Sequence, residues 1–468
     1  MNVDLPSSGN TEPSAPGLER AVAERIDAST MGTVQLRILF LCMSLSCLDG
    51  YDIASMGLAV PLIAREWNIS PGSFGGALAA VMGGSAIGGF TLGWLGDRIG
   101  RRPMVISSAI GISLASIGSM WADNATQMIA WRFLIGIAFG TGLPNVYALV
   151  GESVPSRHRT FCSTLLAASA SVGGIASGLA APTLSSWLGW KGIFLSGGLV
   201  TLLIALLMLF LLGESPQVLA ARARVRALVA ALADFGLDNT NLPEHRPAPR
   251  RRGGGPLSLV RDGLFPISFF YLLGYISCGF AYYLLSNWLP ALLTHSGWPS
   301  SSAQRSTAIV FGGSMVGGLS LSWIMDRLQR GSLFVPAIVF TLGAVLFVPV
   351  GYLLTSSLVL PLLGALAFVI GGGQYVMPAL AVRLFPPSVL ATALSWIFPL
   401  SRVGGFFGSL AGGWMLLSGW SGSRIMMVLG LAPLLSAIAF AALSVAVTQR
   451  QKTQIEVAGF VRTEISAG

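Results

Sequence analysis

The segment Leu48-Asp49-Gly50-Tyr51-Asp52 places two carboxylates in the middle of the first long apolar stretch, which runs from near Leu36 to near Leu62. About 20 consecutive apolar residues are enough to cross a bilayer as a helix, so both acids are expected at membrane depth. An ionisable group there costs at least ~2.5–3.5 kcal/mol, and such groups usually line a path for ions or substrates. Residues three apart are neighbours on a helix surface, so Asp49 and Asp52 are predicted to share one face.

The composition of the whole chain indicates the same class of protein. Hydrophobic residues make up 53% of the chain and charged residues 10%, and the mean hydropathy is +0.72. Soluble domains carry roughly 25% charged residues, so the sequence predicts a polytopic membrane protein. The four cysteines lie in apolar segments without the spacing of metal ligands, and we expect them to be small buried hydrophobic residues. No cleavable signal peptide is evident in the polar N-terminal segment.

The chain has a net charge of +9, and its basic residues are unevenly distributed among the loops. Basic residues gather in alternate loops, for example Arg98, Arg101 and Arg102 after the second apolar stretch and 250–252 in the middle of the chain. An excess of arginine and lysine marks cytoplasmic loops, so the charge predicts an orientation with both termini in the cytoplasm. We therefore expect the charge to orient a multi-pass protein in the bacterial inner membrane, and we expect no binding of nucleic acid.

Apolar stretches of spanning length recur about twelve times, and a long polar segment separates the sixth from the seventh. We expect an all-α membrane protein of twelve transmembrane helices in two pseudo-symmetric six-helix bundles. The predicted division is a cytoplasmic N-terminal tail, a first bundle, a cytoplasmic linker with an amphipathic helix, a second bundle and a cytoplasmic C-terminal tail, at residues 1–34, 35–213, 214–263, 264–447 and 448–468.

The two halves repeat each other in sequence at a nearly constant offset. Asp97-Arg98 corresponds to Asp326-Arg327 at a shift of 229 residues, and Val172-Gly173-Gly174 corresponds to Val403-Gly404-Gly405 at a shift of 231. Two parallel six-helix halves are the arrangement of transporters that alternate access to a site near the bilayer midplane. The sequence therefore predicts a site between the halves.

The loop after the second stretch reads Gly93-Trp94-Leu95-Gly96-Asp97-Arg98-Ile99-Gly100-Arg101-Arg102 and resembles the loop signature of the major facilitator superfamily. Glycine permits a tight turn, and Asp97 can cap a helix or pair with arginine. The second copy is degenerate because Ser322 and Gln329 replace glycines, so we expect it to be mainly structural. The predicted residues of this conformational latch are Gly93, Asp97, Arg98, Arg101, Arg102, Glu152, Asp326 and Arg327.

Four shorter motifs resemble the aromatic acid/proton symporters of this superfamily. They are Asp49-Gly50-Tyr51-Asp52, Gly151-Glu152, Asn287-Trp288-Leu289-Pro290 and Ser401-Arg402-Val403-Gly404-Gly405. The resemblance implies the major facilitator fold and proton-coupled import of a small aromatic carboxylate, similar to benzoate or hydroxybenzoate, by alternating access. It also implies that the two acids and Arg402 serve proton coupling and substrate binding.

Depth in the membrane supports a substrate role for Arg402 independently. At 1.5 Å per residue, Asp49 and Arg402 both lie about 20 Å from the cytoplasmic start of their helices, near the midplane. A lone cation at that depth is costly unless it meets an anion, and guanidinium matches a carboxylate through two hydrogen bonds. A substrate carboxylate is one such partner, and a permanent structural ion pair with Asp49 or Asp52 is the alternative.

Arg132 lies one or two turns from the predicted outer end of the fourth stretch. It either extends to the outer membrane interface or lies near Asp52 and tunes the affinity of that acid for protons. Other polar and aromatic side chains could complete a site for a flat ligand, although each one singly is more often a packing or interface residue. The candidates for substrate binding are Tyr51, Asn287, Gln374, Tyr375 and Trp396, with Tyr282, Tyr283 and Phe398 as further aromatic residues.

Motifs of enzymes are missing from the sequence. It contains no phosphate-binding loop, nucleophile elbow or histidine pair with metal spacing, so we expect no catalytic residue, metal or cofactor. We expect a monomer whose partners are the substrate, protons and the lipid bilayer. Two alternatives remain open. One is a major facilitator transporter for aliphatic acids, or for export of drugs or metabolites by proton antiport, and the other is a non-transporting membrane receptor.

Overall fold

The computed structural model of this protein describes residues 17–92, 95–238, 240, 242–243, 264–328, 334–385 and 387–467. At Asp97, 387–398 and 451–467 it describes the backbone without the side chains. The described chain is built of α-helices and short 3-10 helices joined by loops, without a strand. The all-α fold predicted from the sequence is therefore confirmed.

Twelve long helical segments make up the bundle. Eleven segments of the described chain are long and apolar enough to cross a membrane, and α15, with 31 residues, is the twelfth long helix. Those of the first half are α2 (Thr33–Glu66), α3 (Gly75–Leu92), α5 (Arg101–Gly118), α6 (Ala125–Ser153), α7 (Ser156–Leu188) and α8 (Trp190–Leu211). Those of the second half are α11 (Phe265–His295), α12 (Ser300–Leu328), α13 (Val335–Tyr352), α14 (Val359–Leu384), α15 (Pro387–Leu417) and the pair α16 (Gly422–Leu429) and α17 (Leu431–Ala467).

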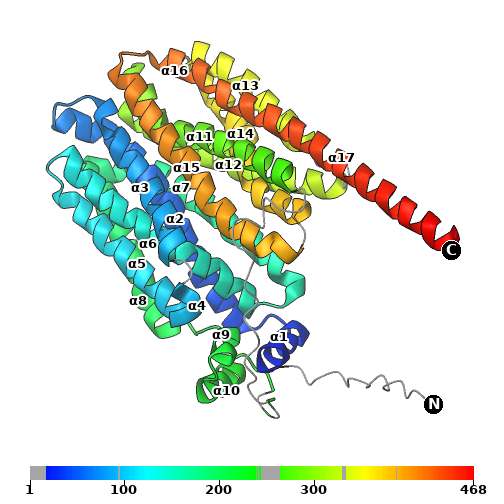
Figure 1. Ribbon diagram of the computed structural model, residues 1–468. Coiled ribbons are helices and arrows are strands. Elements are labelled where there is room, and N and C mark those ends of the chain that lie inside the picture. Colours follow the sequence, from blue (N-terminus) through cyan, green and yellow to red (C-terminus); the bar gives the residue numbers. More distant parts are fainter. Residues whose placement is uncertain are drawn as a thin grey trace, which may run out of the picture.

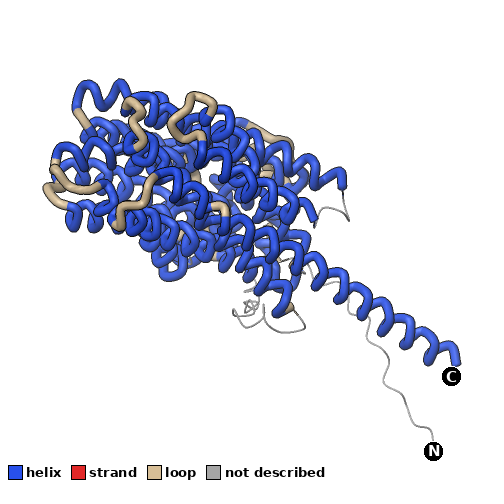
Figure 2. The backbone as a smooth tube through the Cα atoms, turned by 90° about the horizontal axis from the view of Figure 1, so that it is seen from above, coloured by secondary structure: helices blue, strands red, loops and turns tan. Residues whose placement is uncertain are grey.

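Each half is held together by contacts between helices that are distant in sequence. In the first half α2 packs against α7, α3 against α6, and α5 against α6 and α8. In the second half α12 packs against α14, and α11 against α15 and α17. The most extensive contacts between the halves are those of α3 with α15, α7 with α12 and α2 with α11, and the halves lie side by side in Figure 1. Figure 2 shows one helical bundle, from which the C-terminal end of α17 projects.

Backbone contacts repeat between the halves at the offset found in the sequence. Gly173 of α7 lies directly against the carbonyl of Cys47 in α2, and Gly404 of α15 lies in the same way against the carbonyl of Ile276 in α11. A Cβ atom at either glycine would overlap that carbonyl oxygen. Small residues thus allow the close helix packing that holds helices together in lipid. The predicted sequence repeat is therefore present in the packing.

Three short helices form a separate cluster at one end of the bundle (Figure 1). α1 (Leu18–Ala28) packs on α9 (Pro216–Ala221), which packs on α10 (Val225–Asp234). Their buried side chains form a small apolar core of Leu18, Val22, Ile26, Leu219, Ala220, Leu228 and Leu232. α9 and α10 occupy the linker segment for which the sequence predicts an amphipathic helix, whereas α1 is a helix that the sequence analysis did not predict.

At the opposite end of the bundle the two halves touch each other. Gly72, in the 3-10 helix η1 (Pro71–Phe74), packs against Gly413 of α15. Gln304 of α12 donates a hydrogen bond to the carbonyl of Leu58 in α2 at 3.4 Å. Contacts between the halves therefore close the bundle at the end away from α1, α9 and α10.

Candidate functional site

Asp49 and Arg402 form an ion pair between the two halves. Arg402 Nη2 of α15 lies 3.2 Å from Asp49 Oδ2 of α2, and the two side chains are 15% and 8% exposed. Arg402 Nη1 also lies 3.7 Å from the sulfur of Met82, and its Cζ lies 5.7 Å from the centre of the Tyr283 ring. In this structure Arg402 therefore has the protein carboxylate as its partner, one of the two partners considered from the sequence.

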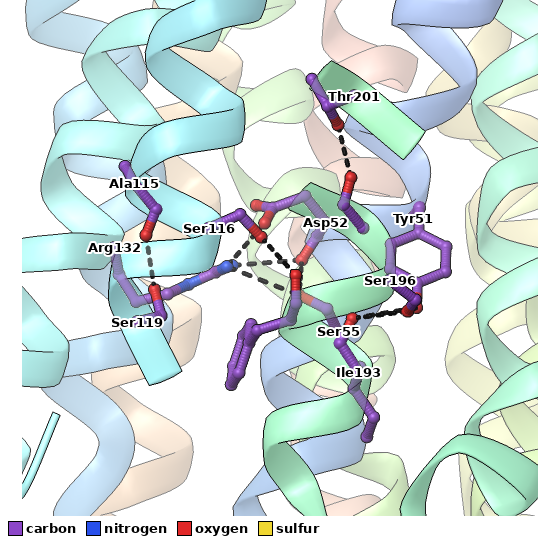
Figure 3. A network of polar contacts seen from close by, with 12 residues as sticks. Tyr51, Asp52, Ser55, Ala115, Ser116, Ser119, Arg132, Ile193, Ser196 and Thr201 are labelled. Carbon is purple, nitrogen blue, oxygen red and sulfur yellow. Dashed lines mark hydrogen bonds and ion pairs between the residues drawn. The ribbon is translucent and has the colours of Figure 1, made fainter. Parts of the chain in front are cut away.

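Asp52 and Arg132 form a second ion pair, which lies within the first half (Figure 3). Arg132 Nη1 of α6 lies 2.7 Å from Asp52 Oδ1, and Arg132 Nη2 donates to the backbone carbonyl of Asp52 at 3.1 Å. The side chain of Arg132 is 2% exposed, and the Phe194 ring lies 5.9 Å from its Cζ. Arg132 therefore points into the bundle toward Asp52 and does not extend to the membrane interface.

A small cavity of about 10 Å³ adjoins Asp52. Its lining comes from α2, α5 and α8 and comprises Leu48, Tyr51, Asp52, Ser55, Ile112, Ser116, Gly197 and Thr201. A volume of ~10–15 Å³ is the smallest that holds one water molecule. Asp52 Oδ2 is buried and has no hydrogen-bond partner among the described residues. Such an oxygen is costly to bury as part of an anion, so it is a position where a proton can be held.

The two acids have different partners although they lie three residues apart on α2. Three residues turn an α-helix by about 300°, so the side chains diverge by about 60°. Asp49 faces α15 in the other half, whereas Asp52 faces α6 in its own half. Their spacing predicts that both acids share one helix face, but in the structure Asp49 forms a contact between the halves and Asp52 a contact within one half.

Three tyrosines extend from Arg402 along α11 and α14. The ring of Tyr283 lies beside Arg402, the ring centres of Tyr283 and Tyr282 are 5.3 Å apart, and those of Tyr282 and Tyr375 are 6.3 Å apart. Ser171 of α7 donates a hydrogen bond to the Tyr375 hydroxyl at 3.0 Å, from the first half to the second. We refer to Tyr282, Tyr283 and Tyr375 as the tyrosine wall. Its rings meet edge to face, a favourable arrangement for aromatic pairs.

Two predicted site residues are buried amides that each carry an oxygen without a partner among the described residues. Asn287 Nδ2 donates to Ser409 Oγ at 2.9 Å, and Asn287 Oδ1 accepts no hydrogen bond. Gln374 Oε1 is likewise without a donor. Asn287 follows Tyr283 by one turn of α11, and Gln374 precedes Tyr375 in α14. Because buried oxygens normally have a donor, these two can accept hydrogen bonds from a polar ligand.

One other predicted site residue, Tyr51, is not brought to Arg402. Tyr51 faces α8, where its hydroxyl lies 2.7 Å from Ser196 Oγ and 3.1 Å from the carbonyl of Ile193. Two residues turn an α-helix by about 200°, so Tyr51 and Asp49 project from nearly opposite sides of α2. Tyr51 lines the cavity beside Asp52, and Figure 3 shows its side chain next to Ser196. Its assignment to substrate binding stays a prediction. The side chain of Trp396 lies outside the described residues.

In the first half, Arg101 makes the contacts described for the predicted latch. It lies at the end of the bundle near α9. Arg101 Nη2 lies 3.1 Å from Glu152 Oε1, and Arg101 Nη1 donates to Asn145 Oδ1 at 3.2 Å. These contacts tie the start of α5 to α6. Gly93 and the side chain of Asp97 lie outside the described residues, and Arg98 is exposed.

The second copy of the latch ties α12 to α14. Asp326 Oδ1 lies 2.5 Å from Arg383 Nη2, and Arg383 Nη1 donates to the carbonyl of Met325 at 3.0 Å. The guanidinium of Arg327 lies over the Trp323 ring at 4.0 Å. The contacts described for the first copy therefore lie within the first half, and those described for the second copy lie within the second half.

Sequence reasoning missed two residues that the structure brings into these sites. Glu214 Oε1 accepts hydrogen bonds from the backbone N–H groups of Arg101 and Arg102 at 3.0 and 3.1 Å, and so caps α5. A carboxylate is favourable at a helix N-terminus, but this cap reaches across 112 residues and has no local signal. Ser171 had a signal, because the internal repeat aligns it with Arg402 at a shift of 231.

The similarity to known proteins extends across both halves. A family model described as "Major Facilitator Superfamily" matches residues 42–409, which include both ion pairs. The chain belongs to this superfamily. It is therefore a multi-pass membrane transporter and not an enzyme, as the resemblance in the loop after α3 implied.

Relatives of this major facilitator transporter include transporters of aromatic acids. The gallate transporter of Pseudomonas putida is 33% identical over 433 residues, which cover 90% of this chain and 94% of that protein. The 4-hydroxybenzoate transporter PcaK of Pseudomonas aeruginosa is 30% identical over 437 residues, covering 91% of this chain and 96% of that protein. The narrower resemblance to aromatic acid transporters, stated from four motifs, is confirmed over nearly the whole chain.

Solved structures show the same major facilitator fold. The crystal structure of a D-xylose-proton symporter matches with a TM-score of 0.68 at 19% identity, covering 86% of this chain and 97% of that chain. The inward open conformation of the xylose transporter XylE from E. coli matches with a TM-score of 0.67 at 19% identity, covering 87% of this chain and 95% of that chain. At this level of identity the likeness concerns the fold alone.

Proposed function

We propose that this transporter imports a small aromatic carboxylate together with a proton, by alternating access across a bacterial inner membrane. The observation that carries the proposal is the buried ion pair of Asp49 and Arg402, which joins the two halves. Such a pair must break or change its partner when the halves rock about a midplane site, so it can link substrate binding to movement. The names of the relatives, which include gallate and 4-hydroxybenzoate transporters, support the substrate class.

Arg402 exchanges its partner in the proposed cycle. A substrate carboxylate competes with Asp49 for the guanidinium, which can hold a carboxylate through two parallel hydrogen bonds. Asp49 then carries a buried charge without a counter-ion, which is costly unless its carboxylate takes up a proton. Binding of the anion and binding of the proton therefore favour each other, and the loaded site has the same net charge as the empty one.

The second ion pair contributes to proton coupling from within the first half. Asp52 Oδ2 faces no donor in the described part of the chain, so a proton there neutralises the acid without displacing Arg132 Nη1 from Oδ1. Arg132 is deeply buried and stabilises the ionised form of Asp52. In the proposed role, this arginine sets how readily Asp52 binds and releases a proton.

The tyrosine wall and the two buried amides provide the rest of the proposed substrate site. A flat ring packs favourably on the faces and edges of tyrosine rings. Asn287 Oδ1 and Gln374 Oε1, which have no donor among the described residues, accept hydrogen bonds from polar substituents or from water that enters with the substrate. The site thus combines one cation with aromatic surface and a few polar groups.

The orientation follows from the distribution of charge. We assign the end with α1, α9 and α10 to the cytoplasm, because arginines gather there, and the closed end with Gly72 and Gly413 to the outer face. Both termini then lie in the cytoplasm. Arg101 with Glu152 stabilises one end state of the cycle in its proposed role as a latch. The pair of Asp326 and Arg383 in the second half has a mainly structural role in this proposal. We propose a monomer, because both sides of the site come from one chain.

Uptake of labelled 4-hydroxybenzoate into vesicles that contain the purified protein tests the proposed function. Accumulation is expected when the outside is more acidic than the inside, and no accumulation is expected without the gradient. Arg402→Ala should abolish accumulation. Arg424→Ala removes an exposed arginine that stacks on Trp420 in the same half and should leave uptake unchanged. Gradient-independent uptake, or full accumulation in Arg402→Ala, would overturn the proposal.

A further inference from the structure

Ser171, Tyr282 and Tyr375 bring three hydroxyl groups together at the contact between the halves. Ser171 Oγ lies 3.0 Å from the Tyr375 hydroxyl, which lies 3.5 Å from the Tyr282 hydroxyl. The second distance is at the outer limit of a hydrogen bond. A hydroxyl group offers one hydrogen and two lone pairs, so the two tyrosines retain capacity for a further hydroxyl group. We refer to these three residues as the hydroxyl cluster.

The hydroxyl cluster lies at the far end of the tyrosine wall from Arg402. The contacts run from Arg402 to the ring of Tyr283, from Tyr283 to Tyr282, and from Tyr282 to Tyr375. The tyrosine wall therefore has the Arg402 guanidinium at one end. At the other end it has hydroxyl groups that can form further hydrogen bonds.

The internal repeat explains why a hydroxyl and a guanidinium occupy the two ends. Ser171 on α7 and Arg402 on α15 are equivalent positions, and Gly173 and Gly404, two residues further on, make equivalent backbone contacts. Both positions therefore face the contact between the halves. The first half presents a neutral hydrogen-bonding group there, and the second half presents a positive charge. This asymmetry suits a ligand with a carboxylate at one end and a neutral polar group at the other.

We propose that the hydroxyl cluster binds a ring hydroxyl of the substrate while Arg402 binds its carboxylate. The inference rests on the proposed function and narrows the substrate class to hydroxylated aromatic carboxylates, in preference to unsubstituted benzoate. A site that hydrogen-bonds a substrate hydroxyl discriminates against the analogue that lacks it. The bond from Ser171 to Tyr375 already exists without ligand, so the loss on binding benzoate is limited to one neutral hydrogen bond, roughly two- to tenfold in kcat/KM.

The test compares uptake of 4-hydroxybenzoate and benzoate by the full-length protein in vesicles, under one proton gradient. The wild-type ratio of kcat/KM is expected to favour 4-hydroxybenzoate. Tyr375→Phe removes the central hydroxyl and should lower that ratio roughly two- to tenfold. Tyr271→Phe is the matched control, because it removes a buried tyrosine hydroxyl of the same half that donates to the carbonyl of Met377 at 2.8 Å, and it should leave the ratio unchanged.

Ser171→Ala and Tyr282→Phe provide independent readings if Tyr375→Phe does not fold. Each should also lower the preference for 4-hydroxybenzoate. Suppose that the wild type transports both acids and that this transport depends on Arg402. If the ratio of kcat/KM for 4-hydroxybenzoate to that for benzoate then favours benzoate, or does not change in any of the three variants, the proposed role of the hydroxyl cluster is wrong and the proposed function stands. A wild type that accumulates neither acid under the gradient overturns both.

Discussion

Arg132 holds Asp52 through two contacts that belong to a single half of the protein, 2.7 Å to the carboxylate and 3.1 Å to the backbone carbonyl. The pair of Asp49 and Arg402, three residues away on α2, crosses between the halves. Rocking of two rigid halves leaves the first pair unchanged and separates or rearranges the second. Movement of the halves therefore affects the ion pair of Asp49 but not that of Asp52, although both acids lie in one helix turn. Substitutions at the two positions should therefore have different effects.

Asp49→Asn should abolish accumulation driven by the proton gradient but preserve exchange of labelled for unlabelled acid. An asparagine keeps the size of the side chain but takes up no proton, and it leaves Arg402 available to the substrate throughout the cycle. Both activities are measured in the same vesicles, and Asp123→Asn, at an exposed carboxylate before α6, is the control. Wild-type accumulation by Asp49→Asn would mean that the proton is not carried on Asp49.

Arg132→Ala should destabilise the protein by about 3–5 kcal/mol, because it leaves the Asp52 carboxylate buried without its cation. Asp52→Leu combined with Arg132→Met replaces both charges by apolar groups and should restore most of the stability. The measurement is the thermal unfolding midpoint in detergent. Arg20→Ala is the control, since its ion pair with Glu24 is exposed and is worth only about 0.3–0.5 kcal/mol. Equal losses in the single and double variants would contradict a buried, paired Asp52.

Glu152→Gln should lower the maximum rate of uptake several-fold and change KM by less than about twofold, because a substitution that acts on turnover alone leaves binding intact. Arg101 loses the Glu152 carboxylate in this variant, but the substrate site is untouched. The same pattern is predicted for Asp97→Asn on the basis of the loop motif. Concentration dependence of uptake gives both constants, with Glu19→Gln in the exposed part of α1 as control. A normal rate in both variants would remove the latch assignment.

Val22→Asp should detach α1 from the linker helices. Val22 is fully buried in the small apolar core, and a carboxylate there has no partner, so its burial is strongly unfavourable. Arg25, which donates to the carbonyls of Asp238 and Thr240, would become free for trypsin. Limited proteolysis is expected to cleave at Arg25 faster in Val22→Asp than in wild type. The exposed Glu24→Ala should behave as wild type, and unchanged cleavage in Val22→Asp would show that α1 is not held by this core.

Much of the candidate site could be predicted because depth in the membrane is a local property of the sequence. Counting residues from the ends of apolar stretches placed Asp49 and Arg402 near the same depth, and the structure pairs them. The direction of a side chain around its helix was harder to predict, since an error of one residue rotates it by about 100°. Tyr51, for example, is a substrate-binding candidate by residue type and depth, and only the structure shows that its hydroxyl faces Ser196 of α8.

The sequence by itself determined the class of protein, the twelve long segments and the internal repeat, because hydropathy, charge and spacing act over short stretches of chain. Only the tertiary structure decided which acid meets which arginine, that Glu214 caps α5, and that Ser171 meets Tyr375 across the halves. Those contacts join residues far apart in sequence. They depend on how helices rotate and pack against one another, and in lipid that packing is set by small residues such as Gly173 and Gly404.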